Sequence, residues 1–271
     1  MTKVSVDVGR IKREEDFHDG WAESIQIDEL LVSESFEMPT ALENQHIIKQ
    51  MGSLKGKRIL DFGCGAGEAA VYFATQGAYV YACDISSGFL QVVNSLATKF
   101  GVTVQTAKCD SAKTPYEDNY FDFVYGNGIL HHVELEQTSI EVRRILKPGA
   151  KAFFIEPLPY NPAINVYRKM AEAVRTVDET PLSFKQMDAF GSRFAKYEHQ
   201  EFWLFTLSIF FHFFFIRRWH PSKVRYWKRL IESGQEYAGL MRFWQKWDSH
   251  CMRMLPFLKY LCWNTVIQVK K

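Results

Sequence analysis

The sequence lacks the features that mark secreted, metal-binding and membrane-spanning proteins. It has only five cysteines in 271 residues, and none of them form the C-x-x-C pairs of zinc sites or redox motifs. Residues 1–19 are polar and charged, without the apolar core of a signal peptide. The longest apolar stretch, residues 202–216, has 15 residues, whereas a spanning helix needs about 20. These absences predict reduced thiols, no metal site and a cytoplasmic protein.

The charge is unevenly distributed along an otherwise ordinary globular composition. Residues 1–150 carry 14 Lys and Arg against 21 Asp and Glu, and residues 151–271 carry 19 against 10. The acidic first half argues against a broad nucleic-acid surface. The basic second half is either one charged side of a single domain or a face for an anionic partner.

Residues 59–68, ILDFGCGAGE, are the most informative stretch of the chain. An apolar strand leads into three alternate glycines, Gly63, Gly65 and Gly67, and a helix-forming segment follows. Such a turn lets backbone N–H groups approach a ligand at a helix N-terminus. The spacing is G-x-G-x-G, with Asp61 before it, and differs from the G-x-G-x-x-G of dinucleotide sites. It predicts a nucleotide-like cofactor here, the alternative being a turn that only closes a βα unit.

Strands and helices alternate over residues 57–156. This alternation predicts a parallel sheet with right-handed crossovers and helices on both faces. Ligands of such sheets bind beyond the carboxyl ends of the strands. The predicted strands are 57–62, 78–84, 102–106, 121–125 and 151–156, with a sixth at the start of 202–216 and a last one at 261–269; the predicted helices include 41–51, 68–76, 87–100 and 137–146.

Polar residues stand at the ends of these predicted strands. Asp84 ends the second strand, Asp110 follows the third, and Glu156 ends the fifth. The fourth strand leads into residues 126–133, GNGILHHV, whose two glycines let the backbone pass close to a ligand. These residues are therefore predicted to meet at one edge of the sheet.

Taken together and in this order, the motifs resemble those of the class I S-adenosylmethionine-dependent methyltransferases. Residues 61–67, DFGCGAG, resemble the family's D/E-x-G-x-G-x-G motif, and residues 126–133 resemble a region of its small-molecule enzymes that often ends L-H-H. Residues 145–151, ILKPGAK, match the family's L-K-P-G-G-x turn, with alanine in place of the second glycine. The resemblance covers residues 57–156 strongly, and residues 17–22 and the last strand more weakly.

The resemblance implies an α/β fold: a Rossmann-like, seven-stranded sheet with helices on both faces, an N-terminal helical lid and a C-terminal helical cap. It also implies a single methyltransferase domain that binds S-adenosyl-L-methionine. The expected divisions are 1–50 for the lid, 51–160 for the cofactor-binding core, 161–258 for the substrate cap and 259–271 for the final strand.

The resemblance assigns cofactor contacts to particular residues. Asp84 would accept hydrogen bonds from the two ribose hydroxyls, a task that suits a short carboxylate. Asp110 would bond the adenine amino group, and Asn127 the methionine part. The alternatives are a helix N-terminal acid for Asp84 and a solvated loop acid for Asp110. The predicted cofactor-binding set is Asp61, Gly63, Gly65, Gly67, Asp84, Ile85, Asp110 and Asn127.

Methyl transfer to a hydroxyl or a protonated amine requires a base that takes a proton. His131 is the first candidate because the pKa of an ordinary imidazole suits this task. His132 is the second candidate and is expected chiefly to support the loop. Glu156 would orient His131 or hold the acceptor. The alternatives are two structural histidines and a carboxylate that caps backbone N–H groups.

Substrate contacts are expected from the N-terminal region and from a proline-rich turn. His18 and Trp21 belong to the predicted lid, where plain packing is an equal alternative. Tyr160 lies in the turn at 157–162, PLPYNP, the clearest hinge of the chain.

The aromatic stretch 202–216 is followed by a segment, 217–229, in which Arg and Lys alternate with Trp and Tyr. Three interpretations stay open: the core of a substrate cap, a membrane surface and an oligomer contact. The sequence thus predicts a methyltransferase that acts at O or N of a small, largely apolar metabolite in secondary metabolism. If the basic segment belongs to a substrate pocket, this metabolite is also expected to have an anionic end. The alternatives are a membrane-associated lipid or quinone methyltransferase, peripheral to the membrane, and a non-catalytic cofactor-binding module. A monomer or homodimer without nucleic acid is expected.

Overall fold

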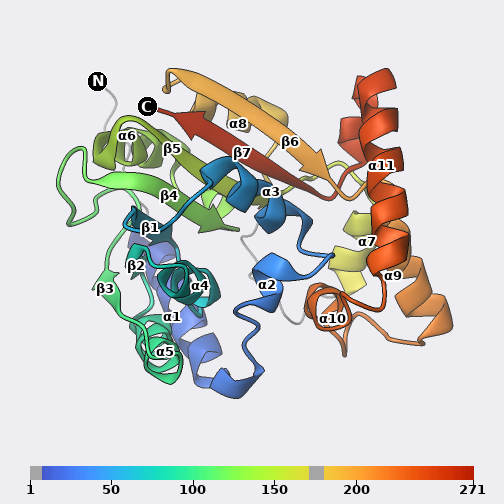
Figure 1. The fold of residues 1–271 in the computed structure, drawn as a ribbon, viewed down its shortest axis with the longest axis horizontal. Helices are drawn as coiled ribbons and strands as arrows, with labels where there is room; N and C mark the ends of the chain where they lie inside the picture. The colour runs from blue at the N-terminus through green and yellow to red at the C-terminus, as the bar shows by residue number, and fades with distance from the viewer. Residues whose placement is uncertain (1–7, 171–179) are drawn as a thin grey trace.

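The computed structural model describes residues 8–170 and 180–271, and a seven-stranded sheet forms its centre (Figure 1). The strand order is β3-β2-β1-β4-β5-β7-β6; β7 is antiparallel to both of its neighbours, and the other pairs are parallel. The predicted Rossmann-like sheet is confirmed. Its strands are β1 (Arg58–Phe62), β2 (Tyr79–Asp84), β3 (Val104–Lys108), β4 (Phe121–Asn127), β5 (Leu146–Pro157), β6 (Lys196–Phe202) and β7 (Asn264–Lys270).

Helices cover the sheet and extend beyond it as a lid and a cap. The α-helices are α1 (Val8–Glu23), α2 (Glu34–Glu37), α3 (Leu42–Met51), α4 (Glu68–Thr75), α5 (Ser87–Lys99), α6 (Leu135–Ile145), α7 (Pro162–Met170), α8 (Phe184–Gly191), α9 (Ile209–Phe211), α10 (Tyr226–Glu232) and α11 (Ala238–Met254). Shorter 3₁₀ turns are η1 (Ile27–Glu29), η2 (Leu130–His132), η4 (Thr206–Ser208) and η6 (Pro256–Leu261), and η5 (His212–Ile216) is a π-helical turn.

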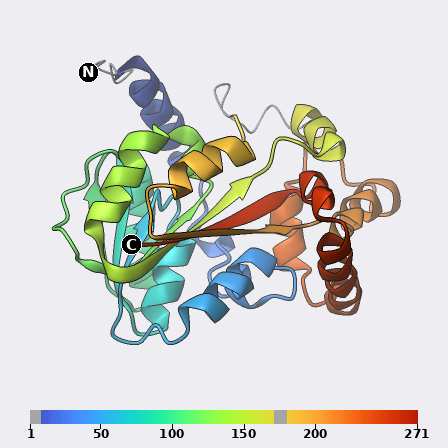
Figure 2. The ribbon, with the colours of Figure 1, turned by 90° about the horizontal axis from the view of Figure 1, so that it is seen from above.

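The sheet is buried on both faces because successive strand residues point to opposite sides. Ile59 and Phe153 pack in a core with α3, α4 and α5, whereas Leu60 and Phe154 pack in a second core with α6 and α8. Figure 2 shows α3 and α4 on one side of the sheet and α6 and α8 on the other. Strands buried on both faces explain the continuous apolar runs in the sequence.

The predicted position of the sixth strand is wrong. β6 spans Lys196–Phe202 and so precedes the aromatic stretch instead of beginning it. It is an edge strand with one neighbour, β7, and most of its residues are exposed or half-buried. A solvated edge strand needs few apolar residues, so the sequence of β6 lacks the apolar pattern of a buried strand. The apolar pattern of the neighbouring aromatic stretch instead indicates a strand at the wrong position.

The aromatic stretch forms the core of the cap, which lies beyond the carboxyl ends of the parallel strands (Figure 1). From Thr206 the chain runs through η4, α9 and η5, and its buried side chains pack against α7, α10 and α11. Phe213 is fully buried, and its ring lies 5.4 Å from that of Tyr226. The buried side chains of this stretch therefore form a cap core, which is one of its three predicted interpretations.

The lid helix α1 is fixed to the start of α5. Asp19 accepts hydrogen bonds from the Ser86 hydroxyl (2.5 Å) and the Gly88 N–H (3.0 Å). Ser86, the N-cap of α5, in turn accepts from the Phe89 N–H (3.0 Å). A Cβ at Gly88 would lie 2.9 Å from the Cβ of Ala22, so only glycine permits this approach.

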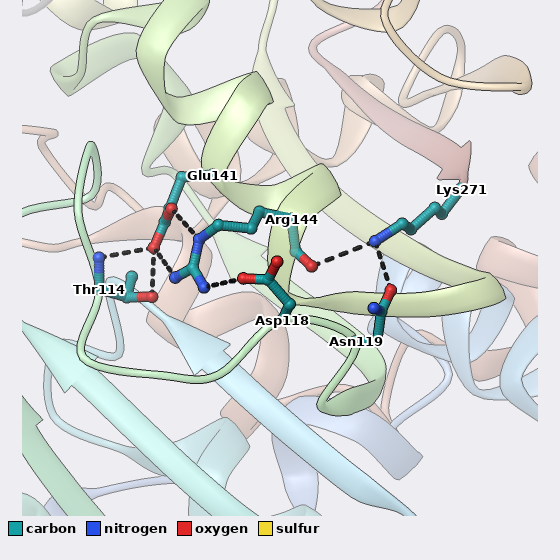
Figure 3. Close-up of polar contacts among 6 residues, drawn as sticks. All are labelled: Thr114, Asp118, Asn119, Glu141, Arg144 and Lys271. Atoms are coloured by element: carbon teal, nitrogen blue, oxygen red, sulfur yellow. Dashed lines mark hydrogen bonds and ion pairs between the residues drawn. The ribbon is translucent and has the colours of Figure 1, made fainter.

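A polar network fixes the loop that follows β3 (Figure 3). The Glu141 carboxylate accepts from the Thr114 N–H (2.7 Å) and from Arg144, whose guanidinium also pairs with Asp118 at 2.7 Å. The Lys271 ammonium donates to the Arg144 carbonyl at 3.1 Å. These contacts join the loop, helix α6 and Lys271, and residues 110–112 of the same loop line the cavity described next.

Candidate active site

A cavity of about 1390 Å³ opens at the carboxyl ends of β1, β2, β4 and β5. This exceeds the usual range of about 300–1000 Å³ for one small-molecule site. The lid helix α1 and the segment around η1 form one side, and α7, α10 and residues next to β6 and β7 form the other. The cavity therefore lies between the sheet edge and the cap.

The glycine turn after β1 shapes the floor of this cavity. Gly63, Gly65 and Gly67 have φ of +69°, +48° and +82°, in the left-handed region that favours glycine. A Cβ at Gly63 would lie 2.5 Å from Ile129, and one at Gly67 would lie 2.6 Å from Val93. At Gly65 nothing lies within 4 Å, so this position leaves space for a ligand.

The N–H groups of this turn bond within the protein. Those of Gly63 and Cys64 donate to the Cys83 carbonyl at 2.9 and 3.0 Å, and that of Gly65 donates to the Asp84 carboxylate at 3.0 Å. The sequence pattern suggests amides that face a ligand. In the structure these three amides instead fix the turn against β2 and orient Asp84.

Three carboxyl groups line the cavity around the turn: Asp61 is buried, and Glu68 and Asp84 are half-buried. The Asp61 carboxylate accepts from the Ala70 N–H (3.0 Å) and that of Glu68 from the Leu31 N–H (2.9 Å). Burial, with the nearby charges of Asp84 and Glu68, raises the pKa of Asp61 to about 7. Burial also raises the pKa values of Asp84 and Glu68. A cation in this part of the cavity would stabilise all three charged forms.

The other predicted cofactor residues take different places. Ile85, Asp110 and Asn127 line the cavity, whereas Gly67 does not. The Asp110 carboxylate also accepts from the Ala112 N–H at 3.0 Å, which fixes its loop.

His131 and Glu156 lie in direct contact at the end of β5. His131 Nδ1 is 2.6 Å from Glu156 Oε2, and the other carboxylate oxygen accepts from the Leu130 N–H at 2.6 Å. Because a carboxylate only accepts, Nδ1 carries the proton and Nε2 has the basic lone pair. Gly128 (φ +70°) leaves room beside the ring, since a Cβ there would lie 3.7 Å from His131 Cε1. Glu156 is fully buried, and both of its carboxylate oxygens are bonded to these partners.

His132 faces the lid instead. Its Nδ1 lies 3.4 Å from the buried carboxylate of Glu14, which is also 3.4 Å from His18 Nε2. Hydrogen bonding to His132 and His18 holds the pKa of Glu14 well below its ordinary value. The Trp21 ring stacks on His18 with centroids 6.2 Å apart. Sequence reasoning missed Glu14, although its i,i+4 spacing from His18 on one helix was a usable signal.

The cap contributes a basic and aromatic wall to the cavity, and Arg225, Trp227 and Lys228 of the segment 217–229 belong to it. The Arg225 guanidinium lies 4.9 Å from the Trp21 ring centroid, and Lys228 pairs with Glu29 at 2.8 Å. Both contacts join cap and lid. The other residues of this wall are Tyr167, Arg168, Trp203 and Trp263.

Tyr160 lies outside the cavity lining. Its hydroxyl accepts from the Phe184 N–H at 2.9 Å, and its ring stacks on that of Phe184 at 5.3 Å. Among residues 8–170 and 180–271, no group of three or more His, Cys, Asp or Glu side chains can hold a metal ion.

Residues 60–154 match a family model described as a methyltransferase domain. Among curated proteins, a ubiquinone/menaquinone biosynthesis C-methyltransferase of Cupriavidus taiwanensis is 34% identical over 40% of this chain and 46% of its own length. A sterol 24-C-methyltransferase of Schizosaccharomyces pombe is 28% identical over 63% of this chain and 47% of its own length. The chain thus spans about half the length of these curated relatives.

Solved structures share the fold at low identity. Geranyl diphosphate C-methyltransferase from Streptomyces coelicolor superposes with a TM-score of 0.57 at 15% identity, covering 85% of this chain and 78% of that one. Haemonchus contortus phosphoethanolamine N-methyltransferase 2 gives a TM-score of 0.55 at 20% identity, covering 84% and 52%. These likenesses show the fold alone.

Proposed function

We propose that this chain is a class I S-adenosylmethionine-dependent methyltransferase that transfers a methyl group to a small, largely apolar acceptor, because residues 60–154 match a methyltransferase-domain model. In this proposal residues 1–50 act as the lid, 51–160 bind the cofactor, 161–258 form the substrate cap and 259–271 complete the sheet.

The residues around the glycine turn fit S-adenosyl-L-methionine, which carries a sulfonium and an ammonium charge. Asp61, Glu68 and Asp84 line the cavity there, and burial disfavours their charged forms until a cation approaches. The open space at Gly65 supports the same fit. Asp84 would bind the ribose, Asp110 the adenine and Asn127 the methionine part. When bound, the cofactor supplies an electrophilic methyl group on a positively charged sulfur.

The single observation that supports a catalytic role is the 2.6 Å contact between His131, which lines the cavity, and Glu156, which lies buried behind the cavity surface. In the proposal His131 Nε2 accepts the proton that the acceptor loses, and Glu156 holds the ring and stabilises the imidazolium. His132 and Glu14 support the loop from the lid side. The acceptor atom proposed is O or N. The alternative is an activated carbon, because the two curated relatives are named C-methyltransferases.

The cap wall supports an acceptor with an apolar body and an anionic end. Trp203 and Trp263 line it together with the cations Arg168, Arg225 and Lys228. Aromatic faces bind apolar rings, and guanidinium groups bind carboxylate or phosphate. His18 and Trp21 would contact the acceptor from the lid side. Such an acceptor supports a tailoring role in secondary metabolism.

Two measurements on the purified chain test the proposal. Calorimetry with S-adenosyl-L-methionine and its demethylated product measures binding, and the absence of affinity for both would overturn the cofactor assignment. Incubation of cell extracts with trideuteromethyl cofactor, followed by mass spectrometry, detects labelled products, and NMR of a product identifies its O, N or C atom. Binding without a product from any extract would favour the non-catalytic module.

A further inference from the structure

The outer side of the cap carries exposed apolar side chains next to exposed cations. On α11, the exposed fractions of Phe243, Trp247 and Met254 are 53%, 47% and 66%, and on the following turn Phe257 reaches 63%. α11 lies at the cap end of the molecule, on the opposite side from β3 (Figure 1), and at the same end in Figure 2. Side chains of this size are rarely left in water together.

The apolar residues of α11 form one stripe. At about 100° per residue, Leu240, Phe243, Trp247 and Met254 fall within a sector of about 60°. The buried Met241 belongs to the opposite, inward-facing side of the helix. The side chains of this stripe therefore do not take part in the packing of α11 against the rest of the cap.

A basic stripe adjoins the apolar one. Arg242, Lys246 and Arg253 are exposed and occupy a neighbouring sector of about 40°. They line an open groove of about 400 Å³ together with Gln245, Ser249 and His250.

No carboxylate on this face neutralises the cations. The sole acid within residues 238–261 is Asp248, which is buried and accepts from the Phe205 N–H (2.7 Å) and the Thr206 hydroxyl (2.8 Å). Nearby Glu232 pairs with Arg229 at 2.7 Å. The face therefore presents positive charge beside apolar rings.

We propose that this face, defined by Leu240, Arg242, Phe243, Lys246, Trp247, Arg253, Met254 and Phe257, binds the surface of a bilayer that contains anionic lipids. Its apolar side chains would enter the boundary between headgroups and acyl chains, and its cations and groove would bind lipid phosphates. No helix within residues 8–170 and 180–271 is long and apolar enough to cross a bilayer, so the helix lies on the surface.

The charge favours a bilayer over a second copy of the chain. A two-fold contact places the same patch of both copies together. On this face it would bring the cations of both copies, Arg242, Lys246 and Arg253, into one contact without carboxylate partners from α11. An anionic bilayer supplies the opposite charge and accepts the apolar stripe at the same time.

Flotation of the full chain with vesicles tests the proposal, which does not depend on the catalytic assignment. We expect binding to phosphatidylcholine vesicles that contain phosphatidylserine, weaker binding to phosphatidylcholine alone, and loss of binding at high salt. The triple variant Arg242→Gln, Lys246→Gln, Arg253→Gln should partition roughly 100-fold less, at about fivefold per cation. The double variant Phe243→Ser, Trp247→Ser should also lose binding.

Matched controls change the same kinds of residue elsewhere. Lys55→Gln, Lys113→Gln, Lys185→Gln removes three exposed cations, and Ile140→Ser removes an exposed apolar side chain of α6. Both should float like the wild type. Calorimetry with the cofactor on every variant separates this test from that of the proposed function.

Two results would overturn the proposal. One is a wild-type chain that does not float with anionic vesicles, or face variants that float as well as it does. The other is a lipid-free dimer that the face variants abolish, since a second copy would then be the occupant.

Discussion

The cavity has two walls of opposite character. The wall built by the sheet carries the carboxyl groups of Asp61, Glu68 and Asp84, and Glu156 lies buried behind this wall. Each of the four accepts a hydrogen bond from a backbone N–H. The wall built by the cap carries guanidinium and ammonium groups among indole rings. The first is positioned by strand ends and tight turns, the second by side chains on short helices.

This difference in charge indicates on which side of the cavity a cationic ligand and an anionic ligand would each bind. A cation is favoured against the sheet and an anion against the cap, because each wall repels the wrong charge. A methyl donor with sulfonium and ammonium groups and an apolar, anionic acceptor would thus bind on opposite sides, with the His131–Glu156 pair close to the first wall. The predictions below test each wall separately.

The largest expected effect comes from the proton acceptor. His131→Asn keeps a donor toward Glu156 but removes the basic nitrogen, so kcat should fall by about 10²–10⁴-fold while cofactor affinity stays unchanged. Steady-state kinetics and calorimetry measure the two. The control is His199→Asn, which alters another His–Glu pair (Nδ1 to Glu201 Oε1, 2.5 Å) on β6, outside the cavity lining. An unchanged kcat for His131→Asn would remove His131 as the base.

The acidic wall is tested next by Asp84→Ala. Hydrogen bonds to a charged group contribute about 1.5–3 kcal/mol each, so the cofactor Kd should rise roughly 10- to 100-fold. Calorimetry measures it. Asp28→Ala removes an exposed carboxylate that pairs with Lys99 and should leave Kd unchanged. Equal affinities of the two variants would contradict the role of this wall.

The basic wall is tested by Arg225→Gln. Loss of the cation beside Trp21 should raise the acceptor KM by roughly 2- to 30-fold, the range expected for a cation–π contact and its charge. Cofactor Kd should not change. Arg229→Gln is the control on the same helix, since its guanidinium lies over Trp219 (5.5 Å) and does not line the cavity. A raised cofactor Kd with a normal acceptor KM would invert the assignment of the walls.

The smallest effect concerns the stability of the acidic wall itself. The folded chain raises the pKa of Asp61 from 3.8 to about 7, so it favours the protonated carboxyl. The wild type should therefore lose stability relative to Asp61→Asn as pH rises from about 4 to about 7, with a constant difference above that. Thermal unfolding of both proteins without cofactor, across this range, should show Tm values that diverge by a few degrees. Parallel curves would show that Asp61 titrates normally.

The parts that sequence predicted rest on short-range patterns. The glycine spacing at residues 63–67 and the alternation of strands and helices over residues 57–156 are short-range signals, and they located most of the sheet and Asp84. The meeting of His131 and Glu156 followed from the rule that parallel strands end at one edge.

The parts that sequence missed depend on contacts between distant segments. Glu14 reaches His132 across more than a hundred residues, and the Trp203 N–H donates to the Glu43 carboxylate across 160. No periodicity encodes such pairs. The polar edge strand β6 was missed because its solvated residues lack an apolar signature.

Asp19 couples the position of the lid helix α1 to the order of Asp84 at the end of β2. Its carboxylate holds the Ser86 hydroxyl and the Gly88 N–H, two and four residues beyond Asp84, so whatever orders Asp84 also orders the attachment point of α1. Such coupling is reciprocal. A ligand bound at Asp84 stabilises the docked lid by the same free energy by which the docked lid strengthens binding of the ligand. Amide hydrogen exchange along residues 8–23 should accordingly slow on cofactor addition, although the helix lies far from that loop in the sequence.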